Sequence, residues 1–261
     1  MDQAASQLGD TLLRAVSGIM CCMISRRIFT TSAAAALAAT PARAQSRAVL
    51  VELFTSQGCS SCPPADAVLT RLSQRAGVVA LAFHVDYWDY IGWKDPYASP
   101  GGTKRQRDYR VTFGNNSVYT PQMVLNGSVE FPGQNEAEAL RAVASAAATS
   151  GPDITMVRTS SEVRIELAPA SVRGEMAVFG AVYASAKSTR VSRGENAGRT
   201  LTNSNIVRSF GVLGDYNGDA TAISWTPKLE GAPVGGLAVW IQPKTLGPVI
   251  AAASLTLGGA A

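Results

Sequence analysis

The sequence predicts an α/β fold for the first half of the chain and a β-sandwich-like arrangement for the second half. Apolar runs of strand length alternate with segments of helical spacing up to about residue 150, and short strand-like runs separated by turns follow. The tripeptide Gly151-Pro152-Asp153 interrupts the pattern between the two. We therefore expect an α/β domain at 45–150 and a β-rich domain, or an extension of the first, at 151–261.

The N-terminal segment has the order of an export signal. Residues 25–29 (Ser-Arg-Arg-Ile-Phe) resemble a twin-arginine motif, and an alanine-rich apolar stretch follows at 32–42. Ala42-Arg43-Ala44 is typical of a signal-peptidase site, because small residues flank one variable position. An amphipathic helix is the alternative. We interpret 1–44 as a removed signal of the twin-arginine type, which predicts a periplasmic or secreted mature protein.

The first half contains four predicted strands and three predicted helices. Apolar, β-branched runs predict buried strands at 48–54 and 78–85, and Asn126-Gly127 predicts a hairpin between strands at 122–125 and 128–131. Helical spacing predicts helices at 64–75, 103–111 and 136–148. The second half predicts strands at 154–159, 162–167, 176–184, 206–212, 222–226, 237–241 and 249–257, with a glycine-rich turn at 193–201.

Composition and charge argue against a nucleic-acid-binding protein and against a membrane-spanning protein. Hydrophobic residues make up 46% and charged residues 16% of 261, and the net charge is only +4. The one basic cluster, Lys104-Arg105-Gln106-Arg107, is predicted to be a solvated helix face, so no nucleic-acid partner is expected. After signal removal, no uncharged run reaches the roughly 18–20 residues of a membrane span. Nothing in the sequence predicts an oligomeric state.

The spacing of the cysteines predicts a reactive pair rather than a structural disulfide. Cys21 and Cys22 leave with the signal, so the mature chain keeps Cys59 and Cys62 alone. A bond across two intervening residues closes almost no loop and therefore adds little stability. Without a second cysteine pair, one chain cannot form a four-cysteine zinc site. The pair therefore predicts a dithiol–disulfide couple, with half of a zinc site or an inert local disulfide as the alternatives.

The order of elements around this pair resembles a known fold. This order is similar to that of a thioredoxin-like domain of the glutaredoxin type. It runs strand, Cys59-Ser60-Ser61-Cys62, helix, strand, helix, Thr120-Pro121, hairpin and helix. The strings at 51–66 and 84–89 further resemble a family of secreted, thioredoxin-like bacterial proteins of unknown function, and the likeness extends to 193–201. The resemblance implies that fold and an exported location, and it implies no substrate.

Cys59 is the predicted nucleophile and Cys62 the predicted resolving cysteine. A thiolate attacks a disulfide sulfur, and free N–H groups at a helix start favour the thiolate. Pro63-Pro64 complicates this prediction, because proline has no N–H and favours the first helical position. Whether Cys59 or Cys62 lies nearer the helix start therefore stays open.

Further candidate residues surround the pair. The resemblance implies that Thr120 and Pro121 form a cis-proline loop that presents backbone to a substrate peptide. Trp88 belongs to an aromatic loop that either forms a substrate-binding rim or packs onto the second half; the other members are Tyr87, Tyr90, Trp93 and Tyr97. His84, Asp86 and Glu52 are candidates for proton transfer or thiolate tuning. His84 could instead be structural, and strand parity could turn Glu52 away.

The sequence is compatible with three functions. The first is an exported thiol–disulfide oxidoreductase that acts on protein thiols or disulfides in the periplasm and needs no cofactor or metal. The second is a copper(I)-binding or copper-delivery protein, with Cys59, Cys62, His84 and Met123 as ligands. The third is a non-enzymatic binding module whose second half docks a partner. Whether the protein is an enzyme depends on which of these holds.

Overall fold

The computed structural model describes residues 48–146, 151–159, 161–229 and 234–257. These residues all fall within one structural unit. The expected signal at 1–44 lies outside them. No helix in these ranges is both long and apolar enough to cross a membrane.

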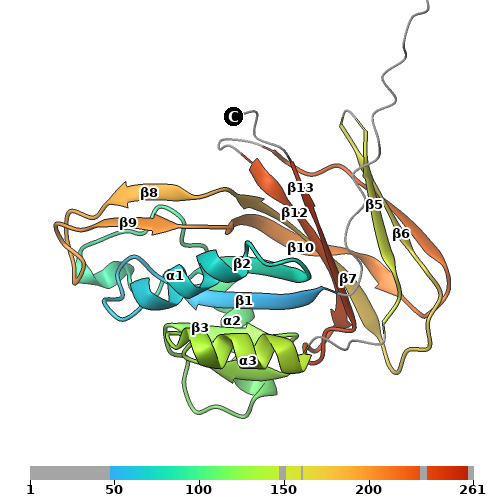
Figure 1. Ribbon diagram of the computed structural model, residues 1–261, viewed down its shortest axis with the longest axis horizontal. Coiled ribbons are helices and arrows are strands. Elements are labelled where there is room, and N and C mark those ends of the chain that lie inside the picture. Colours follow the sequence, from blue (N-terminus) through green and yellow to red (C-terminus); the bar gives the residue numbers. More distant parts are fainter. Residues whose placement is uncertain (1–47, 147–150, 160, 230–233, 258–261) are drawn as a thin grey trace, which may run out of the picture. The chain divides into compact units, whose positions relative to one another are not determined.

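The predicted fold class was wrong. The described residues are mostly β, with 40% in strands and 18% in helices, so the chain is not a typical α/β thioredoxin-like domain joined to a β-sandwich-like part. Strands from before and after residue 150 join one mixed eight-stranded sheet in the order β13-β12-β7-β10-β2-β1-β3-β4 (Figure 1). Its strands are β1 (Val49–Thr55), β2 (Val78–His84), β3 (Gln122–Leu125), β4 (Val129–Phe131), β7 (Met176–Ala184), β10 (Ile206–Tyr216), β12 (Val234–Pro243) and β13 (Ala251–Thr256).

The sheet extends across residue 150 because β7, one of its inner strands, is apolar on both faces. β7 is buried at every position, so neither of its faces can be turned to water. It pairs antiparallel with β10 and β12, and β10 meets β2 at Ile206↔Ala82. On the other side of β2, β1 pairs in parallel and β3 pairs antiparallel with β1. The predicted hairpin joins β3 to β4, with positive φ at Asn126 and Gly127.

Helices and a smaller sheet cover the two faces. α1 (Pro63–Leu72) and α3 (Glu136–Ala146) pack on Val51, Leu53 and Met123. α2 (Pro100–Thr112) packs through Tyr109 on the opposite face. A second sheet covers the apolar face of β7, β12 and β13; its order is β11-β6-β5, from β5 (Ile154–Arg158), β6 (Val163–Leu167) and β11 (Thr221–Trp225).

A two-stranded ribbon that the sequence did not predict extends beside α1 (Figure 1). It consists of β8 (Lys187–Arg190) and β9 (Thr200–Asn203). Their residues are mostly polar and show no long apolar alternation, so periodicity could not reveal them. The ribbon places its connecting loop, 191–199, over the start of α1.

The basic cluster on α2 is not the solvated face that the sequence predicted. Arg105 is buried, and its guanidinium donates to both carboxylate oxygens of Glu52, with Nε 2.5 Å from Oε1 and Nη2 3.0 Å from Oε2. Tyr109 also donates to Glu52, and Gln242 accepts from Arg105. Because β1 alternates its side chains between faces, Glu52 points to α2 together with Leu50 and Phe54.

Candidate functional site

Cys59 and Cys62 form a disulfide at the start of α1. The helix begins at Pro63, with Cys62 as its N-cap, so Cys62 is the cysteine nearer the helix start. The first two helical residues are prolines and have no N–H to offer a sulfur. The polar partners of the Cys59 sulfur are instead the Ser61 hydroxyl at 3.3 Å and the Thr120 carbonyl at 3.8 Å.

The predicted substrate-binding residues lie around the Cys59 sulfur. The Thr120–Pro121 bond is cis, as the resemblance implied, and the Thr120 carbonyl lies next to Cys59. Trp88 donates from its indole N–H to the Thr120 hydroxyl at 2.8 Å. Trp88 also packs close to Gly58: a Cβ added to Gly58 would lie 3.0 Å from the Cβ of Trp88. The loop after β2 is therefore tied to both sides of the disulfide.

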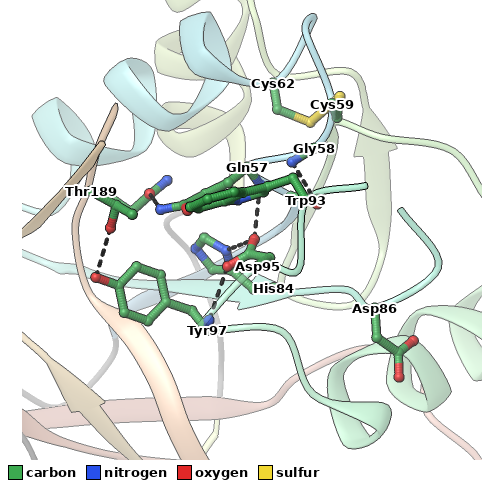
Figure 2. Close-up of polar contacts among 12 residues, drawn as sticks. Gln57, Gly58, Cys59, Cys62, His84, Asp86, Trp93, Asp95, Tyr97 and Thr189 are labelled. Atoms are coloured by element: carbon green, nitrogen blue, oxygen red, sulfur yellow. Dashed lines mark hydrogen bonds and ion pairs between the residues drawn. A yellow bond between two sulfur atoms is a disulfide. The ribbon is translucent and has the colours of Figure 1, made fainter. Parts of the chain in front are cut away.

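A buried histidine–aspartate pair lies next to the loop that carries the cysteines (Figure 2). His84 Nδ1 is 2.7 Å from Asp95 Oδ2, and both side chains are fully buried. Asp95 also accepts from the backbone N–H groups of Gln57 and Tyr97. Burial alone would raise the pKa of Asp95, but His84 and these two N–H donors outweigh it and hold the pKa below its usual value. No sequence pattern identified Asp95 as the partner of His84.

Asp66 is a further buried acid, and no sequence pattern predicted a role for it. It lies in the first turn of α1, where its backbone N–H donates to the Cys62 carbonyl at 3.1 Å. Burial raises the pKa of the Asp66 carboxyl to about 7, although nearby His84 and Thr55 act in the opposite direction. Asp66 Oδ1, His84 Nε2 and Thr55 Oγ1 are all buried without a hydrogen-bond partner among the described residues.

Two predicted tuning residues serve other contacts. Asp86 accepts from the Thr103 hydroxyl at 2.6 Å and lies apart from the His84 pair (Figure 2). Glu52 is bound to Arg105 on the α2 face of β1. Of the three candidates, His84 alone belongs to the polar group beside the cysteines.

The loop at 191–199 closes over the cysteines, although the sequence predicted only a turn there. Asn196 is fully buried and donates from one amide nitrogen to the carbonyls of Gln57 and Cys59, at 3.0 and 2.9 Å. Glu195 accepts from the Ser60 backbone N–H at 2.9 Å, and this contact lowers the pKa of its carboxyl. Cys59, whose backbone carbonyl accepts one of these bonds, is only 1% exposed.

Substituting Asn196 is expected to expose the disulfide. Asn196→Ala removes two hydrogen bonds of about 1 kcal/mol each, so reduction by dithiothreitol should be about tenfold faster or more. Stopped-flow or quenched alkylation measures this rate. Ser188→Ala, which removes a hydroxyl contact on the same ribbon, is the matched control and should not change it. An unchanged rate in the Asn196 variant would show that the loop does not limit access.

The residues of the copper alternative have other partners in this structure. The two sulfurs are bonded to each other, His84 uses Nδ1 for Asp95, and Met123 is buried in the core beneath α1 and α3. Within the described ranges, no three His, Cys, Asp or Glu side chains gather as a metal site would require.

Comparisons with known proteins place the chain in a family. Residues 50–242 match the model of DUF1223, a family described as proteins of unknown function. Protein AGR_C_4864 from Agrobacterium tumefaciens has a similar crystal structure, with a TM-score of 0.70 and 29% identity over 82% of this chain and 96% of that one. HBP35 of Porphyromonas gingivalis shares the fold, with a TM-score of 0.55 and 13% identity over 81% of this chain and 75% of that one. No curated protein sequence matches significantly. The chain therefore belongs to the DUF1223 family.

Proposed function

We propose that this protein is an exported thiol–disulfide oxidoreductase that uses the Cys59–Cys62 couple on protein thiols or disulfides. The supporting observation is the disulfide at the start of α1, which lies beside the Thr120 carbonyl and has the buried Asp66 one turn further along the helix. The twin-arginine-like segment at 25–29 supports export.

Thiol–disulfide exchange proceeds in two steps. In the reducing direction, the Cys59 thiolate attacks one sulfur of a substrate disulfide, and the other substrate sulfur leaves as a thiolate. The Cys62 thiolate then attacks Cys59 in the mixed disulfide, releases the second substrate thiolate and restores the Cys59–Cys62 bond. Two electrons pass from the protein to the substrate. The reverse sequence oxidises a substrate dithiol, and the reduction potential of the couple selects between the two directions.

Asp66 is the group best placed to take the Cys62 proton in this scheme. Asp66 follows Cys62 by one helical turn, as their backbone hydrogen bond shows, and its carboxyl, with a pKa raised to about 7, can hold or release a proton near neutral pH. The buried His84 Nε2 has no hydrogen-bond partner among the described residues. We assign proton storage during exchange to Asp66.

Replacing the proposed nucleophile tests the function directly. Cys59→Ser removes the only sulfur that can form the mixed disulfide next to Thr120, so dithiothreitol-driven reduction of insulin should fall to the uncatalysed rate. The turbidity of precipitating insulin chains measures the rate. Ser60→Ala is the matched control, because it leaves both sulfurs and the Ser60 backbone N–H in place. Equal activity of Cys59→Ser and the wild type would refute the proposal.

A further inference from the structure

One long strand of the large sheet has an unpaired edge. β10 pairs with β7 from Ile206 to Tyr216, but its other edge meets β2 only at Ile206↔Ala82. In the ranges the structure describes, no backbone group from Arg208 to Asp215 makes a hydrogen bond on that second edge. Most side chains of this stretch are exposed or half-buried, unlike those of the neighbouring strand β7. An unpaired edge of this length is a template for another strand.

An apolar groove runs along one face of this edge. It has a volume of about 730 Å³ and lies between α2 and β10; its apolar lining comes from Val111, Phe179, Phe210, Val212 and Leu246. Val111 and Val212 are 68% and 58% exposed, which is unusual for large aliphatic side chains in this protein.

A second, smaller hollow lies on the other side of the same strand. It has a volume of about 250 Å³ and is lined by Gly180, Phe210, Leu213 and Trp225, among others. Because alternate side chains of an added strand point to opposite faces, a strand paired with β10 has a hollow for both sets.

The groove carries little net charge. Lys104 is paired with Asp108, Lys244 with Asp215, and Arg105 with Glu52. A charged segment would have to break one of these pairs or bury an uncompensated charge, so the lining favours uncharged side chains.

We propose that the edge of β10 between Arg208 and Asp215 binds an extended, uncharged segment of another polypeptide as an added β-strand. Free backbone groups of β10 hydrogen-bond the segment, and its apolar side chains fill the groove. α2 lines the groove beside this edge through Lys104, Asp108 and Val111. Because the charged side chains around the groove are already paired, we assign it to an uncharged partner segment.

This surface is separate from the cysteine site. The residues of α2 that line the groove include Lys104, Asp108 and Val111, whereas Thr103 and Gln106 face the opposite way, toward Asp86 and Tyr119. The inference therefore does not depend on the proposed redox function.

A synthetic peptide tests the assignment. The probe is a fluorescein-labelled heptapeptide of alternating threonine and valine, and the control probe has the same side chains with alternate backbone nitrogens methylated. Fluorescence anisotropy with the full-length protein should show saturable binding of the first peptide and binding about tenfold weaker or less for the second, which cannot complete the ladder. Hydrogen exchange should show new protection of β10 amides at 208–215 when the first peptide is bound.

Variants in the groove give the second arm of the test. Val212→Lys places a charge in the groove and should weaken binding about tenfold or more, whereas Val129→Lys, at an exposed valine on β4, should not. Absence of saturable binding at millimolar peptide, or equal binding of both peptides, would overturn the proposal. A concentration-dependent dimer that Val212→Lys dissociates would also overturn it, because the occupant would then be a second copy.

Discussion

Arg105→Met is expected to destabilise the protein by about 3–5 kcal/mol, because it leaves a buried carboxylate without its partner. Glu52 lies in the core of the large sheet, and Arg105 supplies two of the hydrogen bonds to its oxygens. The guanidinium also lies 5.1 Å from the ring centres of both Tyr109 and Trp240, so its loss removes cation–π contacts as well. Urea unfolding at pH 7, followed by circular dichroism, measures the change.

Two further variants separate the charge effect from packing. Adding Glu52→Met to Arg105→Met removes the orphaned charge, so the double variant should recover most of the lost stability. Lys104→Met breaks the exposed pair with Asp108 on the same helix and should change stability by less than about 1 kcal/mol. A double variant as unstable as Arg105→Met would contradict the argument.

The Glu52–Arg105 pair also shows why sequence reasoning stopped short of this fold. Apolar runs predicted strands close to the observed β1, β2, β7 and β12, because burial on both faces leaves a continuous apolar pattern. The same pattern does not predict which strands pair with each other. The partners Glu52 and Arg105 are 53 residues apart, and a basic residue in a polar helix is more often solvated.

The residues of the candidate site also divide into those that a local sequence pattern marks and those that it does not. The cysteines, Thr120-Pro121 and Trp88 were found because local spacing or a resemblance marks them. Asn196 lies 137 residues from Cys59, in a polar loop between two strands without apolar alternation, so no local pattern connects the two residues. Asp66 was overlooked because an acidic residue in the first turn of a helix is ordinary. Its burial depends on packing that only the folded chain provides.

Asp66→Asn is expected to make the protein more stable above pH 7. The pKa of Asp66 is about 7 in the folded protein against an ordinary 3.8, so the folded state binds the extra proton between these values. Stability from this group is therefore greatest near pH 4 and falls as pH rises to 7, by up to about 4 kcal/mol. The amide that Asp66→Asn introduces is neutral at every pH in this range and avoids that cost.

The measurement is urea unfolding of both proteins between pH 5 and 8. In this range Asp95, whose pKa is lowered, stays ionised and contributes no slope. The wild type should lose stability with rising pH relative to the Asp66→Asn variant, and the two curves should converge toward pH 5. Asp108→Asn, at an exposed carboxyl on α2, should follow the wild type. Parallel curves for the wild type and Asp66→Asn would contradict a raised pKa.

The same substitution should slow disulfide exchange while it stabilises the fold. If Asp66 accepts the Cys62 proton, the amide cannot replace it, and insulin reduction at pH 7 should fall about a hundredfold. A buried carboxylate with a raised pKa costs folding free energy at neutral pH, whereas an amide of the same size carries no charge to bury. Opposite changes in stability and turnover would show that the chain accepts this cost to hold a proton one helical turn from Cys62. If the Asp66→Asn variant gains stability and keeps full activity, Asp66 has no part in exchange and belongs to the core alone.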